Sequence, residues 1–248
     1  MPTINPSDRF PLPGRNEVHV WSAFMAESIP CLASLERLLS VAEKQRAARF
    51  FRQEDRFRYV IAHGILRQLL GHYLSVAPAG LEFIHNDHGK PALLREEGQP
   101  ALSFNLAHSG EVIVFALAVD RQVGVDIELV RHDFDVMELA QSQFSEREIK
   151  VLEPITNKAE QTEAFFRCWT RKEAYLKARG EGLGFSLKQF AVSFALHESA
   201  AVLWAADDPL AAERWSVLDL AVLAGYAGAV VCEGRAVQCL SRRWVATS

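Results

Sequence analysis

Residues 101–130, ALSFNLAHSGEVIVFALAVDRQVGVDIELV, divide into three stretches in which apolar and polar residues alternate. Alternation sends successive side chains to opposite faces of a sheet, so we expect strands at 101–106, 112–119 and 123–129. The connections AHSGE and DRQ are short, which predicts antiparallel neighbours and places His108 in a tight turn. These three strands form the centre of the predicted fold.

Helical patterns lie on both sides of this region. Apolar residues recur every three or four positions over 54–74, which predicts an amphipathic helix. A second long helix is expected over 158–178, ended by the glycines of RGEGLG, and alternating stretches follow it. We therefore expect an α+β fold of two similar halves, 1–122 and 123–248, each with antiparallel strands packed on a long helix.

The composition is typical of a soluble globular protein, with 49% hydrophobic and 23% charged residues in a chain of 248. A net charge of −4 and a pI near 6.1 argue against general nucleic-acid binding. The four scattered cysteines form no C-x-x-C pair, so we expect reduced core thiols and no zinc site. We expect a cytoplasmic protein without a signal peptide or membrane segment, since the most apolar stretch, LAVLAGYAGAVV, is too short to cross a bilayer.

Two carboxylates, Asp126 and Glu128, share one face of the third predicted strand. Like charges this close repel unless something neutralises them. On the pattern alone, a solvent-facing strand with two acids is the more frequent explanation. The alternative is a magnesium site, because Mg²⁺ is often held by one or two carboxylates together with substrate phosphates.

The second long helix places another acid, Glu173, on the side of the apolar residues Phe166 and Trp169. A partly buried carboxylate needs a partner or a metal. Lys177 lies one turn further along the same line. The pattern fits a simple ion pair at i,i+4 and a functional site equally well.

Basic residues are concentrated just before and at the start of the first long helix. Arginine suits phosphate because its planar group binds two oxygens at once, although a solvated helix face would give the same pattern. Lys90, in the turn GKP, and His108 are turn residues that most often remain solvated. The basic residues concerned are Lys44, Arg46, Arg49, Arg52, Arg56 and Arg58.

The order of these elements resembles the Sfp-type 4'-phosphopantetheinyl transferases, from about Val41 to Leu187. The most specific motifs are GVDIE at 124–128 and the W-x-x-K-E-x-x-x-K pattern that begins at Trp169. The resemblance implies a pseudo-dimer of two α+β halves with coenzyme A between them. It also implies transfer of phosphopantetheine from coenzyme A to a serine of an apo acyl or peptidyl carrier protein, with release of adenosine 3',5'-bisphosphate.

The resemblance further implies the roles of individual residues. Mg²⁺, or Mn²⁺, would be held by Asp126, Glu128 and Glu173. Glu173 is also the candidate base, and Lys177 would neutralise the pyrophosphate or the leaving group. His108 would contact the 3'-phosphate and Lys90 a phosphate nearby. Coenzyme A contacts are implied for Lys44, Arg46, Arg58, Lys90, His108 and Lys177.

The chain departs from the family pattern at two positions. Ala47 and Ala107 stand where the family often has a lysine and a serine. Neither change removes the predicted metal site.

The region 132–162 is expected to dock the carrier through apolar contacts such as Met137, Leu139 and Phe144, unless these residues are simply core. A monomer suffices for an internal pseudo-dimer. Two alternative functions remain at this stage: another magnesium-dependent phosphotransferase, and an inactive module that binds coenzyme A or a carrier.

Overall fold

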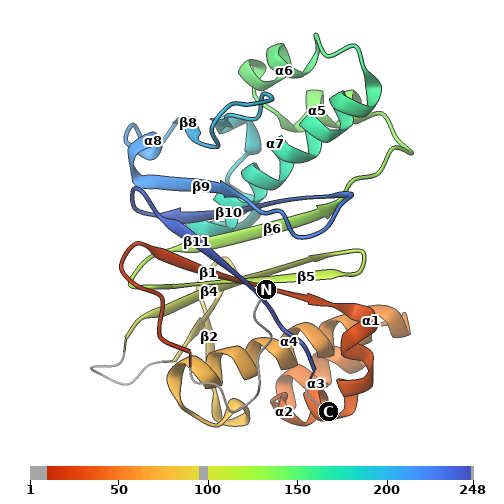
Figure 1. The fold of residues 1–248 in the computed structure, drawn as a ribbon, viewed down its shortest axis with the longest axis vertical. Coiled ribbons are helices and arrows are strands. Elements are labelled where there is room, and N and C mark those ends of the chain that lie inside the picture. The colour runs from red at the N-terminus through yellow and green to blue at the C-terminus, as the bar shows by residue number, and fades with distance from the viewer. Residues whose placement is uncertain (1–9, 95–99, 247–248) are drawn as a thin grey trace.

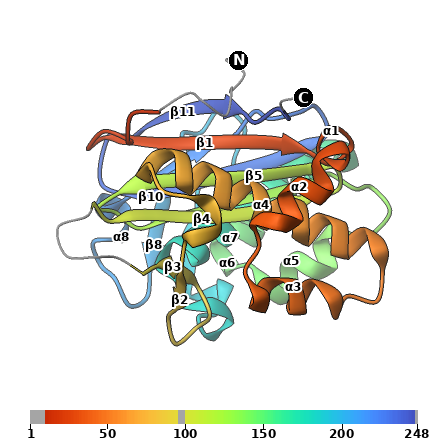
Figure 2. The same cartoon turned by 90° about the horizontal axis from the view of Figure 1, so that it is seen from below.

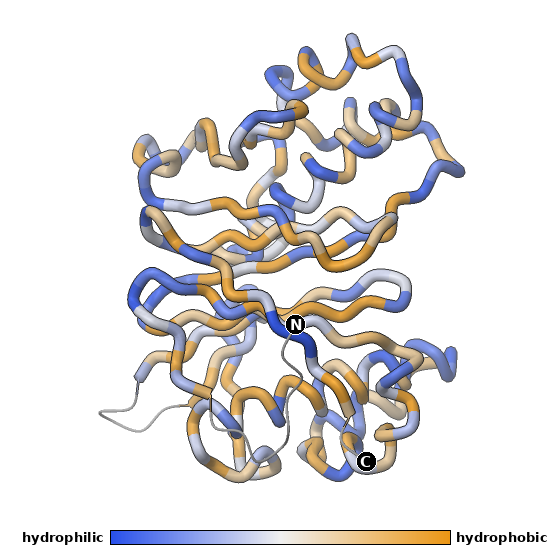
Figure 3. The backbone as a smooth tube through the Cα atoms, viewed as in Figure 1, coloured by the Kyte–Doolittle hydropathy of each residue, from blue (hydrophilic) through white to orange (hydrophobic). Residues whose placement is uncertain are grey.

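The computed structural model describes residues 10–94 and 100–246 and has an α+β fold, as predicted. Two sheets lie face to face, and helices cover the outer face of each (Figure 1). In the tube view, hydrophobic residues follow the strands of both sheets (Figure 3). The helices are α1 (Met25–Ser28), α2 (Leu32–Leu38), α3 (Val41–Ala48), α4 (Gln53–Leu74), α5 (Val136–Gln143), α6 (Glu146–Leu152), α7 (Lys158–Arg179) and α8 (Ala211–Arg214).

The first sheet has the order β11-β1-β5-β4, and the second has the order β6-β10-β9. Two small hairpins, β2–β3 and β7–β8, complete the described strands. Figure 2 shows β1 and β11 on one side of the molecule, and β4 on the other side with α3. The strands are β1 (Glu17–Phe24), β2 (Phe83–His85), β3 (Pro91–Leu93), β4 (Leu102–Ser109), β5 (Val112–Val119), β6 (Val123–Leu129), β7 (Phe190–Val192), β8 (Val202–Ala205), β9 (Trp215–Asp219), β10 (Tyr226–Glu233) and β11 (Gln238–Arg243).

Two details of the predicted strands are wrong. β4 continues to Ser109, so His108 is a strand residue paired with Ile113, and the turn consists of Gly110 and Glu111. Gly110 has a φ of 51°, which suits glycine and permits so short a turn.

The second correction concerns β6, which was expected to pair with its neighbour in sequence. It instead crosses into the second sheet and pairs with β10. Val125 and Ile127 on one face of β6 are buried in the core between the two sheets. Gly124 on the other face lies against the backbone of α7. In this position β6 is buried on both faces, between the first sheet and α7, and this burial stabilises its pairing with β10.

Three apolar clusters correspond to the layers. One lies between α4 and the first sheet, one between the two sheets, and one between the second sheet and α7. The last strand crosses back, because β11 pairs in parallel with β1 and Trp244 packs in the first cluster. No helix within residues 10–94 and 100–246 is long and apolar enough to span a membrane.

Gly124 lets α7 lie directly against β6. A Cβ at this position would lie 2.1 Å from the carbonyl oxygen of Ala174 and 2.2 Å from the amide nitrogen of Ala178. Both are backbone atoms, so only a shift of the whole helix could make room. The glycine of the GVDIE motif therefore sets the distance between the strand carboxylates and the side chains of α7.

We expect Gly124→Ala to lower the free energy of unfolding by about 1–3 kcal/mol, the usual range for overpacking. The same change should reduce catalytic turnover, because α7 must move away from β6. Gly80→Ala is the matched control, since a Cβ there meets nothing within 4 Å. Denaturant unfolding curves would compare the two variants, and equal stability of both would contradict this account of the helix–strand contact.

Candidate active site

The site is built where β6, β4 and α7 meet. Asp126 faces α7 because the residues on either side of it face the core between the sheets. The residue is 4% exposed, and Oδ1 accepts a hydrogen bond of 2.6 Å from Nζ of Lys177. The other oxygen, Oδ2, is buried and has no hydrogen-bond partner. Lys177 thus pairs across to β6 rather than with Glu173 along its own helix.

Glu128 points to the same side of β6 and is held by β4. Ser109 Oγ donates to Glu128 Oε2 over 2.7 Å and accepts from the amide of Leu129 over 3.1 Å. Sequence reasoning missed Ser109. The available signal was its position directly before Gly110 in the short connection between two predicted strands.

Glu173 on α7 is half-buried, as its position on the helix predicted. Burial raises its pKa, the charge of Lys177 opposes the rise, and Glu128 adds to it. Burial also raises the pKa of Asp126, to about 7, against the effect of Lys177 and with further contributions from Glu128 and Glu173. The three predicted carboxylates therefore lie within electrostatic reach of one another.

These carboxylates fit a hard cation. Asp126 offers a buried, unpaired oxygen, and the raised pKa values of Asp126 and Glu173 show negative charge that lacks sufficient compensation. Among residues 10–94 and 100–246, no three acidic, histidine or cysteine side chains are already close enough together to hold a metal ion. The donor set is thus suitable, and side-chain movement would be needed to complete it.

Positive groups gather beside the carboxylates. The pKa of His108 is lowered, first by partial burial and then by the charge of Arg58, with smaller effects of Lys177 and His63. Arg58 donates to Asp55 over 3.0 Å, while its Nε is buried without a partner. His108, Arg58, Lys177 and His63 therefore lie close together, as expected for a site that binds a polyanion.

A pocket of about 560 Å³ adjoins this cluster, between α3, α4, the β2–β3 hairpin and β4. Arg46 is the predicted coenzyme A contact that lines it, together with Tyr59 and His63, whose rings stack with centroids 4.0 Å apart. Sequence reasoning missed both rings. Their i,i+4 spacing on the first long helix was the available signal.

Lys90 connects elements that are far apart in the sequence. Its Nζ donates to Ala178 O over 2.9 Å, to Val123 O over 3.1 Å and to Gln122 Oε1 over 3.3 Å. Burial lowers its pKa to about 8. The structure therefore places Lys90 between the hairpin, β6 and the end of α7, and its predicted contact with a phosphate stays a prediction. Lys44 is exposed on α3.

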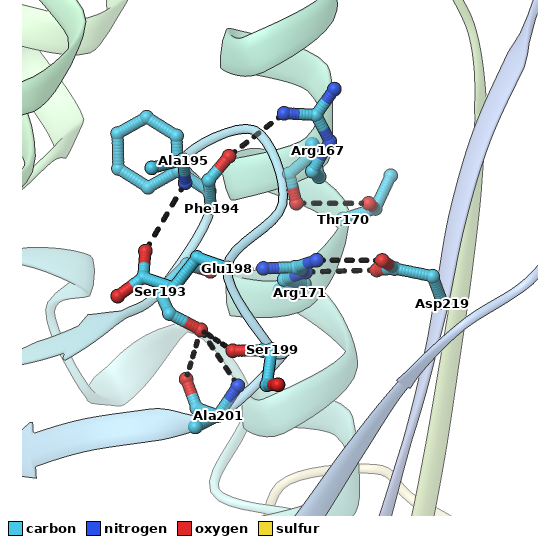
Figure 4. Close-up of polar contacts among 10 residues, drawn as sticks. All are labelled: Arg167, Thr170, Arg171, Ser193, Phe194, Ala195, Glu198, Ser199, Ala201 and Asp219. Carbon is cyan, nitrogen blue, oxygen red and sulfur yellow. Dashed lines mark hydrogen bonds and ion pairs between the residues drawn. The ribbon is translucent and has the colours of Figure 1, made fainter.

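Two buried basic residues fix the orientation of α7. Lys172 Nζ donates to both carboxylate oxygens of Glu148 over 2.7 Å and to Phe190 O over 2.8 Å. Arg171 forms a bidentate ion pair with Asp219 and also donates to the carbonyl oxygen of Ser193 (Figure 4). These contacts hold the helix, while Glu173, the residue after Lys172, faces the site.

The expected docking region, 132–162, contains α5 and α6. Phe144 is 2% exposed and stacks on Phe165, so it is a core residue. Met137 and Leu139 are half-buried against the same cluster. The core interpretation therefore holds for Phe144.

The fold brings clustered carboxylates and basic side chains together at one place. Sequence profiles of the 4'-phosphopantetheinyl transferase superfamily and of the N-terminal region of a 4'-phosphopantetheinyl transferase match residues 122–231 and 21–120. The chain is 36% identical to the 4'-phosphopantetheinyl transferase HetI of Nostoc over 205 residues, which is 83% of each protein. It belongs to the 4'-phosphopantetheinyl transferase family and is a transferase.

Two further relatives are similar over shorter segments. The transferase AcpT of Escherichia coli K12 is 38% identical over 136 residues, covering 55% of this chain and 65% of the relative. The transferase Sfp of Bacillus subtilis is 28% identical over 164 residues, covering 66% and 69%.

Proposed function

We propose that this protein transfers the 4'-phosphopantetheine arm of coenzyme A to a serine hydroxyl of an apo acyl or peptidyl carrier protein. Adenosine 3',5'-bisphosphate is the other product. The observation that supports this most is the buried Asp126, with one unpaired oxygen and Lys177 on the other, beside a cluster of positive groups. Membership of the transferase family supports the same reaction.

The three carboxylates of Asp126, Glu128 and Glu173 would hold Mg²⁺, and Mn²⁺ accepts the same oxygen ligands. When bound, the ion would offset negative charge on the pyrophosphate of coenzyme A. The second half of the chain, 123–248, supplies these acids. The first half, 1–122, supplies most of the phosphate contacts.

The serine Oγ forms a bond to the β-phosphorus, and the bond from that phosphorus to the bridging oxygen breaks. Glu173 accepts the serine proton, and its raised pKa makes the carboxylate a stronger base. Lys177 offsets the negative charge that develops on the leaving group. Phosphates are bound by Arg58 and His108, with Lys44, Arg46 and Lys90 as further contacts.

One chain contains both sheets and all of these residues, so we propose a monomeric enzyme. The four cysteines are free thiols, and this supports a cytoplasmic location. Sedimentation analysis would test the oligomeric state.

We expect His108→Ala to raise the KM for coenzyme A about tenfold, because a charge-assisted hydrogen bond to phosphate contributes roughly 1.5–3 kcal/mol. The kcat should change much less, since the predicted contact of His108 is with the 3'-phosphate and not with the reacting phosphorus. His132→Ala, at another exposed histidine, is the control. An unchanged KM in the His108 variant would contradict the phosphate contact.

Intact-protein mass spectrometry of an apo acyl carrier protein incubated with this enzyme, coenzyme A and Mg²⁺ tests the reaction. The carrier should gain the mass of one phosphopantetheine arm, and the gain should vanish with EDTA. If acyl and peptidyl carriers gain no mass while coenzyme A still binds, the chain is a binding module and the proposed reaction is wrong.

A further inference from the structure

A single hydroxyl joins the end of β4 to the carboxylate of Glu128. Ser109 Oγ donates to Glu128 Oε2 over 2.7 Å, a length typical of a hydrogen bond to a charged oxygen, and it accepts from the amide of Leu129 over 3.1 Å. A hydroxyl has one hydrogen to donate. Because the amide of Leu129 can only donate, that hydrogen is directed to Glu128, and the direction of the bond is fixed.

The turn that follows Ser109 is held by the second sheet. The hydroxyl of Tyr226 on β10 accepts from the amide of Glu111 over 3.0 Å. A Cβ on Gly110 would lie 2.5 Å from the same hydroxyl, so the turn packs tightly against β10. Tyr226 is itself paired with Leu129 in the ladder between β10 and β6. The turn is therefore fixed to the neighbour of β6, and Ser109 to β6 itself.

Each of the two strand carboxylates has one oxygen occupied by a protein donor. Ser109 occupies Oε2 of Glu128, which leaves Oε1 as the other oxygen. Lys177 occupies Oδ1 of Asp126, and Oδ2 is buried without a partner. Each carboxylate thus offers a single oxygen to a cation.

The number of oxygens that a carboxylate offers affects which cation it binds. Ca²⁺ takes roughly six to eight oxygen ligands and often both oxygens of one carboxylate. Mg²⁺ requires near-octahedral geometry at shorter distances, and carboxylates hold it together with water and phosphate oxygens. Two carboxylates that each offer one oxygen therefore suit Mg²⁺, or Mn²⁺, better than Ca²⁺.

We propose that Ser109 is a positioning residue that sets the cation selectivity of the site. By holding Oε2 it keeps Glu128 a ligand with one oxygen, and this favours Mg²⁺ over the larger Ca²⁺. The inference rests on the proposed function for the presence of a cation beside Asp126, Glu128 and Glu173. It adds a residue of β4, in the first half of the chain, to a site whose carboxylates lie in the second half.

Cation binding can be measured without turnover. The melting temperature of the full-length protein, with saturating coenzyme A and no carrier, is followed during titration with MgCl2 or CaCl2, and each titration gives an apparent Kd. The original protein should bind Mg²⁺ more tightly than Ca²⁺. Ser109→Ala should weaken Mg²⁺ binding about ten- to a hundredfold, the usual effect of removing a partner of a metal ligand. Ca²⁺ binding should be retained, because both oxygens of Glu128 become available, so the preference for Mg²⁺ should fall at least about tenfold.

Two further variants separate the selectivity of the site from the fixation of β6. Ser109→Thr keeps the hydroxyl and should keep the preference for Mg²⁺. Asn105→Ala is the matched control, because Asn105 Oδ1 accepts from the amide of Val125 over 2.9 Å, a contact between β4 and β6 that involves no carboxylate. This control should lower the melting temperature as Ser109→Ala does, with the ratio of the two Kd values unchanged.

An unchanged ratio in Ser109→Ala overturns the proposal. An equal shift of the ratio in Asn105→Ala also overturns it, since the effect then comes from the fixation of β6. If neither cation raises the melting temperature of the original protein, the proposed metal site is wrong and the inference with it. If the ratio shifts as expected but the carrier gains no phosphopantetheine, the proposed reaction fails and the role of Ser109 stands.

Discussion

Asp126→Ala should lower the rate of phosphopantetheine transfer by roughly a hundred- to a thousandfold, the size of effect found when a group that stabilises the transition state is removed. Asp126 supplies the one buried carboxylate oxygen at the site without a partner, and it also fixes Lys177. The rate is measured from the adenosine 3',5'-bisphosphate released at saturating coenzyme A, with the mass of the carrier as a second readout.

The same substitution should not lower the thermal stability of the protein, although it lowers the transfer rate. Burial raises the pKa of Asp126 to about 7, so the folded chain holds a carboxylate whose charge is poorly compensated in the absence of a cation. The alanine variant should therefore unfold at the same temperature as the original protein or higher. Functional groups are often retained at such a cost in stability.

Mg²⁺ provides the control for both effects. A ligand that binds the folded chain raises its melting temperature, and this rise should occur for the original protein and be lost in the variant. A variant that keeps metal-dependent transfer at the original rate would show that Asp126 is not a ligand.

Local periodicity was sufficient to predict much of the fold. The helices expected over 54–74 and 158–178 correspond to α4 and α7, and the strands expected at 112–119 and 123–129 are β5 and β6. Each of these elements shows its apolar face within its own residues. Such a pattern does not identify the partner of a strand. β6 pairs with β10, about a hundred residues later, and β11 pairs with β1 from the opposite end of the chain.

In the candidate site, too, the sequence predicted the features that depend on a local pattern and missed those that depend on long-range contacts. The alternation in GVDIE correctly indicated that Asp126 and Glu128 share a face. That face is covered by α7, and only the close approach at Gly124 explains why Asp126 is buried rather than exposed to solvent. The contacts of Lys90 come from elements far apart in sequence, so no local pattern could reveal them.

No role was predicted for Lys172, the lysine of the W-x-x-K-E motif. In the structure it forms a buried ion pair with Glu148. Lys172 is completely buried and donates to both oxygens of Glu148, which is 1% exposed. Glu148 also accepts from Ser145 N over 2.9 Å, Ser145 Oγ over 2.8 Å and Val192 N over 2.9 Å. One ion pair thus ties α7 to the start of α6 and to β7, directly beside Glu173.

Lys172→Met should lower the free energy of unfolding by about 3–5 kcal/mol, because it leaves the carboxylate of Glu148 buried without its cation. The double variant Lys172→Met/Glu148→Gln should lose less, since no charge remains to be buried. Lys150→Met, at an exposed lysine on α6, is the control and should change stability by less than about 0.5 kcal/mol.

Denaturant unfolding of the four proteins measures these differences, and transfer assays below the transition show whether Glu173 is still correctly placed. If the double variant is as unstable as Lys172→Met, the loss comes from packing of the lysine chain against Phe190 rather than from the unpaired carboxylate. If neither variant is destabilised, the buried pair does not fix α7, and the position of Glu173 does not depend on it.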